Sequence, residues 1–244
     1  MTGLRYQLVD VARGVGFGAM FAYHAAWFAT DRGLVDLPIG TDLAWRAFQR
    51  SIAGSFFLLV GVSLVLANRE RVRPGPFAWR LAKLCGGALI VTVASAVLNP
   101  RMLVTYGILH SIAVNSVLGV GLLALARGQG TAGRIGLAAF GVAAIAVSWV
   151  HLPAFDGWLG FTGLGTVHRA TFDFQPMFPW LGVVALGLAA GLGIRRDGAV
   201  ARWGSGAAPV RGLALLGRHA LFLYLAHVPV LVVTVEAVAW WLGR

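Results

Sequence analysis

The sequence predicts an all-α integral membrane protein, a bundle of about seven transmembrane helices with its N-terminus in the cytoplasm. Three observations predict this fold. Of the 244 residues, 58% are hydrophobic and only 12% are charged, whereas a soluble domain carries about 25% charged residues. The apolar residues come in long runs such as 103–126, which contains no Asp, Glu, Lys or Arg. The basic residues gather in alternate connecting segments, as expected for a chain that crosses a membrane repeatedly.

The apolar runs are long enough to be helical membrane spans. About 20 largely apolar residues are needed to cross roughly 30 Å of hydrocarbon. The runs are continuously apolar, whereas the strands of a membrane barrel alternate, so helices are preferred. The expected spans are residues 6–28, 46–68, 79–99, 102–126, 134–152, 177–195 and 216–241. No linker or internal repeat divides the chain, so residues 1–244 are expected to form one domain.

The net charge of +11 has a distribution that favours a membrane topology over a nucleic-acid partner. The segments expected in the cytoplasm hold Arg5, Arg69, Arg71, Arg73, Arg80, Lys83, Arg127, Arg134, Arg195, Arg196, Arg202, Arg211 and Arg218. The opposite side keeps Arg32, Arg46, Arg50, Arg101, Arg169 and Arg244. This positive-inside bias predicts a multi-pass protein of the cytoplasmic membrane. Attraction to anionic lipid or to an anionic cofactor is the secondary interpretation.

Two connecting segments stand out by their length, because structureless loops of this size are usually functional or mobile. The outer segment 153–176 contains Asp156, Trp158, His168 and several glycines. It is interpreted either as a lid or substrate surface, or as an aromatic cap at the membrane interface. The inner segment 196–215 is rich in Gly, Ala and Arg.

The first span carries ionisable groups, which are costly in hydrocarbon and therefore indicate function. At 100° per residue, Asp10, Arg13 and His24 fall within an arc of about 60° on one helix face. His24 lies about 21 Å along the axis from Asp10, so polar groups occupy both ends. Asp10 and Arg13 are either part of a functional inner mouth or a structural ion pair. His24 is either functional or an interfacial histidine bonded to a neighbour.

Two other spans carry histidines. His110 opens the fourth span at a depth similar to that of His24, so the two are expected to line one cavity. His227 in the last span is interpreted as a buried, hydrogen-bonded residue beside Pro229. No His or carboxylate spacing suits a metal ligand set, and no metal is expected. The single cysteine, Cys85, is expected to be a packed, inert thiol.

These residues belong to motifs that resemble the catalytic domain of heparan-α-glucosaminide N-acetyltransferase, in its bacterial members, within a wider superfamily of transmembrane acyltransferases. The motifs follow one another along nearly the whole chain in the order of that family. They are Val9-Asp10-Val11-Ala12-Arg13-Gly14 with Met20 and His24; 55–64; Tyr106-Gly107-Ile108-Leu109-His110; Asp173-Phe174-Gln175-Pro176 with 178–182; and 216–221 with Tyr224-Leu225 and His227-Val228-Pro229.

The resemblance implies transfer of an acyl group, most simply acetyl, from cytoplasmic acyl-CoA to a saccharide or glycoconjugate acceptor on the outer side. An imidazole suits this O- or N-acyl transfer as a base or an acyl carrier. His24 is expected to take that role with His110 as its partner and Asp173 orienting one of them. The donor, acetyl-CoA, is expected near Asp10, Arg13, Arg80, Lys83 and Arg218, since arginines hold phosphates. Membrane lipid is a further expected partner, and a homodimer is left open.

The sequence departs from the family at the histidine itself. In the lysosomal branch the catalytic histidine follows the first helix in a His-Ala-x-Trp setting. Here His24-Ala25-Ala26-Trp27 lies at the helix end, where that branch tends to have Asn. Two other classes of function remain open: a transporter or flippase for a small polar or lipid-linked substrate, and a non-catalytic membrane scaffold.

Overall fold

The computed structural model of the chain describes residues 6–167, 171–195 and 197–243. Arg5, His168, Arg169, Arg196 and Arg244, which entered the predictions above, lie outside these residues. The described residues form helices and connecting segments, and no β-strand occurs among them. The predicted all-α membrane architecture is therefore confirmed.

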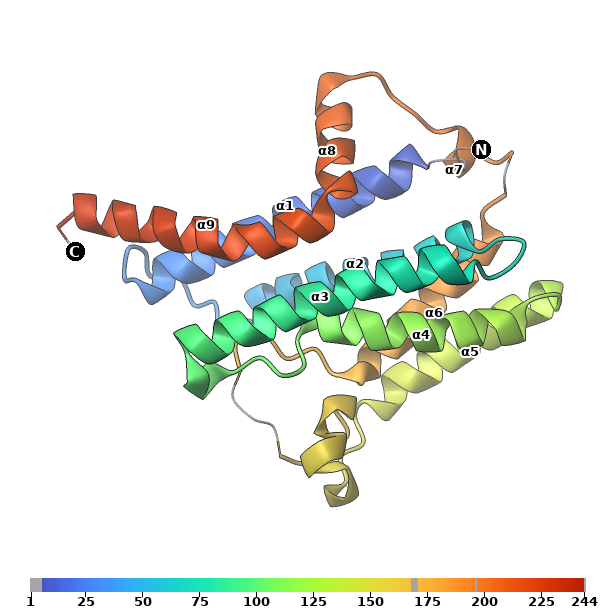
Figure 1. Cartoon of the computed structure of the whole chain (residues 1–244), viewed down its shortest axis with the longest axis horizontal. Helices are drawn as coiled ribbons and strands as arrows, with labels where there is room; N and C mark the ends of the chain where they lie inside the picture. The colour runs from blue at the N-terminus through green and yellow to red at the C-terminus, as the bar shows by residue number, and fades with distance from the viewer. Residues whose placement is uncertain (1–5, 168–170, 196, 244) are drawn as a thin grey trace. The chain divides into compact units, whose positions relative to one another are not determined.

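The chain divides into two compact units, each of which is described here by itself. The first unit comprises Met1–Phe56 with Asp197–Arg244, and the second comprises Phe57–Arg196. Helix α2 (Leu43–Ala67) begins in the first unit and ends in the second. The first unit also contains α1 (Gln7–Asp31), α7 (Ala199–Arg202), α8 (Ala208–Arg218) and α9 (Ala220–Trp241) (Figure 1). The second also contains α3 (Pro74–Leu98), α4 (Ile108–Ala126), α5 (Gly130–Val147) and α6 (Met177–Gly193).

Each of the seven predicted spans coincides with a helix. Five of these helices, α2, α3, α4, α5 and α9, are long and apolar enough to cross a membrane. Helix α6 is apolar but has only 17 residues. Helix α1 has 25 residues but is not among the five, and it carries Asp10, Arg13 and His24. The polar face predicted for the first span thus sets α1 apart from the other long helices.

Several helix boundaries differ from the predicted spans, and helix α4, for example, begins at Ile108 instead of residue 102. Helix α3 begins at Pro74, five residues before the predicted start, because proline is tolerated in a first turn whose N–H groups have no helical partner. Helix α5 covers 130–147 instead of 134–152. The segment 196–215 is not a simple loop, since it holds α7 and most of α8.

Aromatic and aliphatic side chains of α1, α2 and the segment between them form the core of the first unit. Phe17, Met20 and Tyr23 of α1 are buried together with Ile39 and Ile52. Trp27, Trp45, Phe56 and Leu223 pack against this cluster. Within a membrane, van der Waals packing between such side chains stabilises the cluster, because the surrounding lipid is as apolar as they are. The core therefore holds the middle and outer part of α1 in a defined orientation toward α9.

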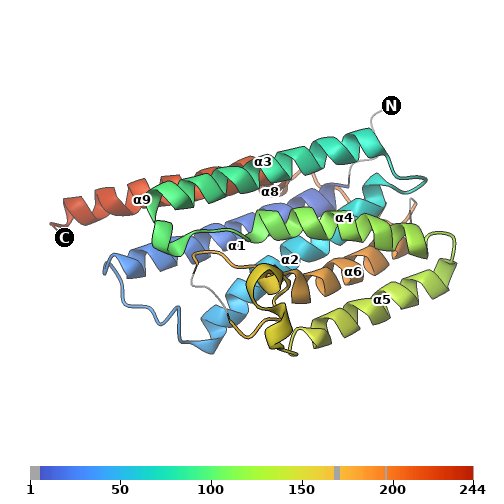
Figure 2. The ribbon, with the colours of Figure 1, turned by 60° about the horizontal axis from the view of Figure 1, so that its bottom comes forward.

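The second unit is held together by close helix packing around α6. Helix α6 packs against both α5 and α4, and α3 packs against α4 (Figures 1 and 2). The rings of Phe57 and Trp180 stack with centroids 4.9 Å apart. Gly141 of α5 and Gly182 of α6 face one another so closely that a Cβ on Gly141 would lie 2.8 Å from the Gly182 carbonyl oxygen. Small residues allow this approach, which is the usual way that helices associate in lipid.

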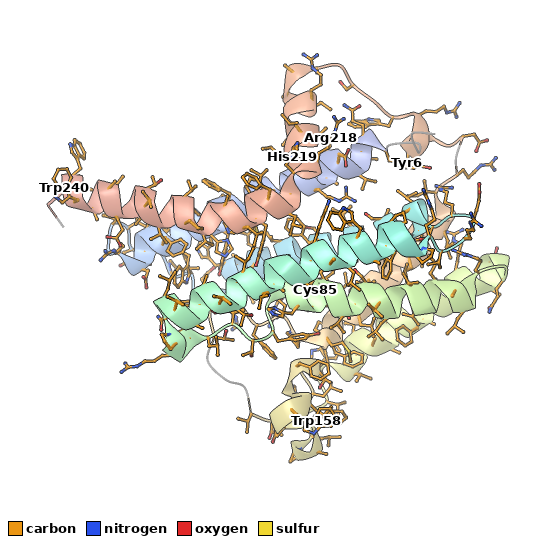
Figure 3. The ribbon with its side chains drawn as sticks, in the orientation of Figure 1. Tyr6, Cys85, Trp158, Arg218, His219 and Trp240 are labelled. Carbon is orange, nitrogen blue, oxygen red and sulfur yellow. The ribbon has the colours of Figure 1, made fainter. Side chains whose placement is uncertain are left out.

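The outer segment between α5 and α6 is ordered by its own hydrogen bonds over the part that the structure describes. It contains two short 3-10 helices, η2 (Pro153–Phe155) and η3 (Gly157–Thr162). The Asp156 carboxylate accepts hydrogen bonds from the backbone N–H groups of Thr166 and Val167, at 2.6 and 3.0 Å. Trp158 points away from this fold with 83% of its surface exposed (Figure 3). Cys85 is also exposed on α3, so its expected burial was wrong.

Candidate functional site

The first unit brings together two histidines that are 203 positions apart in the sequence. His24 lies on α1 and His227 lies on α9, two helices that pack against each other. Nε2 of His227 is 3.2 Å from Nδ1 of His24. His227 is buried, with 4% of its surface exposed, and His24 is half-buried. The two rings therefore form one hydrogen-bonded pair with His24 on its more accessible side.

Backbone carbonyls decide which ring nitrogens carry protons. His24 Nδ1 lies 3.1 Å from the Met20 carbonyl oxygen, and His227 Nδ1 lies 2.5 Å from the Tyr224 carbonyl oxygen. A carbonyl oxygen only accepts, so each Nδ1 must carry a hydrogen. His24 Nδ1–H then donates to Nε2 of His227. A hydrogen on His227 Nε2 as well would set two N–H donors against each other with no acceptor between them.

This tautomer leaves the lone pair of His24 on its Nε2 atom. Among the described residues, no hydrogen bond engages that atom. An imidazole with Nδ1–H bound to a partner and Nε2 unprotonated has the arrangement that general bases and nucleophilic histidines use. The geometry thus singles out one atom of one side chain for proton or acyl transfer.

Aromatic rings enclose the histidine pair. The Tyr23 ring meets the His24 ring edge-on, with centroids 5.6 Å apart, and the Phe17 ring meets His227 edge-on at 6.4 Å. Tyr23 in turn contacts Trp45 at 6.1 Å between ring centroids. This wall keeps water from the pair on several sides and strengthens the hydrogen bond within it, because the local dielectric is low.

The inner end of α1 carries a separate cluster of charges. The Asp10 carboxylate, in a residue only 5% exposed, lies 3.0 Å from Arg13 Nη1 and 3.5 Å from Arg218 Nε. Arg218 ends α8, immediately before the junction with α9 at His219 (Figure 3). Of the five residues predicted at the donor end, three therefore lie together. Two cations around one carboxylate leave the cluster with a net positive charge.

Close packing of α8 on α1 builds this charge cluster. A Cβ on Gly217 of α8 would collide with the Asp10 carbonyl oxygen, and one on Gly14 of α1 would collide with the Leu213 carbonyl oxygen. The two glycines therefore permit a backbone approach that any side chain would prevent. Gln7 fastens the same region, because its side-chain amide exchanges two hydrogen bonds with the backbone of Ser205, at 3.0 and 2.8 Å.

The other two predicted donor residues, Arg80 and Lys83, lie on α3 in the second unit. The Lys83 ammonium stands over the Trp79 ring, 5.1 Å from its centroid. His110 and Asp173 also belong to the second unit, whereas His24 belongs to the first. A shared cavity of His24 and His110 therefore stays a prediction.

Within the second unit, His110 and Asp173 organise the start of α4. The Asp173 carboxylate accepts a hydrogen bond from the Ile108 backbone N–H at 2.8 Å. His110 Nδ1 accepts one from the Gly107 backbone N–H at 3.2 Å, and its Nε2 lies 3.1 Å from the Thr92 hydroxyl. Both ring nitrogens of His110 are thus engaged, in contrast to those of His24. A carboxylate at a helix N-terminus is also favoured by the helix dipole.

Tyr106 precedes α4 and lies near the same helix start. Its ring contacts those of His110 and Phe161, with centroids 6.2 and 5.4 Å away. Burial raises the pKa of the Tyr106 hydroxyl to about 12. The phenol therefore stays protonated at neutral pH and is not a base.

His227 is the site residue that sequence reasoning left out. The sequence marked it as buried and hydrogen-bonded, but its partner on α1 could not be identified from spacing within one helix. Two signals were available. Tyr224, His227 and Pro229 lie within six residues of a span, where polar groups are costly, and His227-Val228-Pro229 belongs to the motifs that resemble the family.

One of the comparisons with known proteins identifies the family of the chain. The family model described as heparan-alpha-glucosaminide N-acetyltransferase, catalytic, matches residues 5–229, which reach into both units. No curated protein and no solved structure matches the chain significantly. Because the match covers most of the 244 residues, the chain belongs to the family of the heparan-α-glucosaminide N-acetyltransferase catalytic domain.

Proposed function

We propose that the protein transfers an acetyl group from acetyl-CoA to a hydroxyl or amino group of a saccharide-type acceptor, with His24 as the catalytic residue. The observation that carries the proposal is the bonding of His24, whose Nδ1–H is held by Met20 and His227. Its Nε2 lone pair is thereby available to a substrate. Family membership supports the reaction class, since the family is one of acetyltransferases.

In the proposed reaction, His24 Nε2 removes the proton of the acceptor while the acceptor oxygen or nitrogen attacks the thioester carbonyl. The new acyl bond forms as the carbon–sulfur bond breaks, and the leaving thiolate takes the proton from His24. CoA thiol and acetylated acceptor are released, and His24 returns to its neutral form. A covalent acetyl-histidine formed on Nε2 and then attacked by the acceptor is the second route open to the same atom.

His227 acts as a positioning residue in this proposal. Its Nε2 accepts from His24 Nδ1–H, which holds the ring in the reactive tautomer. That bond becomes stronger when His24 is protonated, because charge-assisted hydrogen bonds are roughly twice as strong as neutral ones. The Tyr224 carbonyl in turn holds His227 with its Nε2 unprotonated.

The charge cluster of Asp10, Arg13 and Arg218 at the inner end of α1 is proposed to attract acetyl-CoA. Arg13 and Arg218 exceed Asp10 in charge, and planar guanidinium groups suit the phosphates of CoA. Arg80 and Lys83 remain part of the proposed donor set. At the other end of α1, the partly buried ring of Trp45 is proposed to meet the apolar face of a sugar. The cytoplasmic origin of the donor and the outer origin of the acceptor follow from the charge pattern and belong to the proposal.

The decisive experiment is acetyl transfer by purified protein in lipid nanodiscs, with radiolabelled acetyl-CoA and a panel of amino sugars and glycosides. We expect His24→Ala to lower turnover by about 100-fold or more, the usual contribution of a general base. His151→Ala, a histidine exposed in the outer segment, is the matched control and should retain activity. Turnover in His24→Ala equal to that of the wild type would refute the role of His24.

A melting experiment separates the acetyltransferase from its two rivals. CoA that binds the folded protein raises its melting temperature by mass action. A scaffold without a donor site predicts no CoA-dependent shift that Arg218→Gln reduces. A transporter or flippase predicts movement of a labelled substrate across liposomes without consumption of acetyl-CoA, so the same preparation tests all three classes.

A further inference from the structure

A pocket of about 540 Å³ opens in the second unit where α2, α4 and α6 end and α5 begins. Its polar lining consists of Asn68, Arg69, Arg127, Thr131 and Arg134. Among the described residues, none of those lining it is Asp or Glu. Three guanidinium groups thus converge on one cavity without a lining carboxylate to balance them.

Hydrogen bonds place two of these arginines on the pocket wall. Arg127 Nη2 donates to the Asn68 carbonyl oxygen, which ties the end of α4 to the end of α2. Arg69 Nη2 donates to the Ile194 carbonyl oxygen at 2.9 Å, which ties the end of α2 to the end of α6. The pocket is therefore built by bonds between helix ends rather than left between loosely packed loops.

Arg134 differs from the other two arginines. Within the described part of the chain, its guanidinium makes no hydrogen bond or ion pair. A guanidinium has five N–H donors arranged as a planar fork. Arg134 can therefore give a bidentate contact to a ligand in the pocket without breaking a hydrogen bond or an ion pair of the described residues.

The N-terminus of α5 adds to the positive potential. Gly130 and Thr131 line the pocket and form the first turn of this 18-residue helix. Gly128 and Gly130 have φ angles of +82° and +57°, which residues with side chains rarely adopt. No side chain caps this helix start among the described residues, and uncapped N–H groups at a helix N-terminus favour an anion.

We propose that this pocket binds a phosphate ester. Arginine forks match phosphate oxygens bidentately, and a bound phosphate would relieve the repulsion among three cations. The lining also includes the buried apolar residues Val65 and Leu123, which suits a phosphate attached to a less polar group. The lining arginines lie in segments expected at the cytoplasmic surface, where basic pockets between helices hold lipid headgroups.

Two sources can supply the phosphate: an anionic phospholipid or a soluble phosphate compound such as CoA. The inference does not rest on acetyl transfer, because the pocket is defined by residues other than His24 and His227. Binding can therefore be measured in the inactive His24→Ala protein, so that a failure of this proposal and a failure of the proposed function give different results.

The test compares ligand-induced melting shifts of the full chain in nanodiscs. Discs of phosphatidylcholine alone receive pyrophosphate or CoA, and a second set also contains phosphatidylglycerol, an anionic lipid of the kind that basic pockets attract. The variant is Arg134→Gln. The control is Arg71→Gln, which removes the same charge from an exposed arginine that does not line the pocket.

We expect the wild type and Arg71→Gln to be stabilised, and Arg134→Gln to bind about tenfold more weakly, as lost charge-assisted hydrogen bonds imply. A shift with pyrophosphate or CoA that Arg134→Gln reduces and Arg71→Gln keeps identifies a soluble source at this pocket, and a shift of that kind with phosphatidylglycerol alone identifies lipid. No shift with any ligand, or equal shifts for Arg134→Gln and Arg71→Gln, overturns the proposal. If Arg134→Gln does not fold, Arg134→Lys, which keeps the charge but lacks the fork, replaces it.

Discussion

Nε2 of His227 lies 3.2 Å from Nδ1 of His24, so a histidine of the last helix holds the histidine of the first in one tautomer. Each ring is fixed independently by a backbone carbonyl of its own helix, that of Tyr224 for His227 and that of Met20 for His24. The pair therefore depends on how α1 packs against α9.

His227→Ala should lower kcat by roughly 10- to 100-fold with little change in KM, because the substituted protein no longer orients His24, and orientation contributes on this scale. His227→Gln should recover part of the loss, since its amide oxygen can accept the His24 Nδ1–H bond. Steady-state kinetics of the two variants measure this. Equal losses in both would mean that His227 serves packing rather than tautomer control.

Gly217→Ala should destabilise the first unit by about 1–3 kcal/mol, as overpacking at a tight contact does. Its Cβ would collide with the Asp10 carbonyl oxygen and push α8 away from α1. Gly212→Ala on the same helix is the control, because nothing lies within 4 Å of its Cβ position. Thermal unfolding in detergent should lower the melting temperature of the first variant only, and a similar decrease in both would contradict the packing explanation.

Asp10→Asn should also destabilise the protein, by about 1–3 kcal/mol, since a buried carboxylate that pairs with two arginines is replaced by a neutral amide. Because the Arg13 and Arg218 side chains are partly exposed, the expected loss of stability is smaller than for a fully buried ion pair. Asp36→Asn, which alters an exposed acid, should be neutral. The melting temperatures of the two variants test this, and equal values would argue against a stabilising cluster.

Asp173→Ala should cost about 0.5–2 kcal/mol, because it removes the acceptor for the Ile108 N–H at the start of α4. Asp173→Asn should cost less, since the amide oxygen can still accept that bond. If Asp173 only organises α4, the activity per folded molecule stays near the wild-type value in both variants. A specific loss of kcat in Asp173→Asn would instead support the catalytic role that the sequence suggested.

Several features of the chain could be predicted because they depend on neighbouring residues only. Apolar runs predicted the positions of all seven long helices, since a helix needs no distant partner to satisfy its backbone in lipid. The polar face of α1 followed from helical periodicity alone. The motif around Asp10 and His24 also predicted the family, which the match over residues 5–229 confirmed.

Other features were beyond such reasoning. Helix α8 lies in a segment expected to be a loop, because an amphipathic helix of 11 residues has no apolar run long enough to span a membrane. Its place against α1 depends on contacts between Gly14 and Leu213 and between Gly217 and Asp10, which pair residues far apart in the chain. The phosphate pocket likewise joins residues from the ends of four helices.

The sequence by itself determined that this protein is a helical membrane protein, which family it belongs to, and that His24 and Asp10 occupy one face of its first helix. Periodicity, hydropathy and motif order are properties of consecutive residues and can be read without a structure. Only the tertiary structure decided that His227 is the partner of His24 and that Arg218 joins Asp10 and Arg13. Those pairings depend on helix packing between segments about 200 residues apart, and packing geometry is not encoded in any single span.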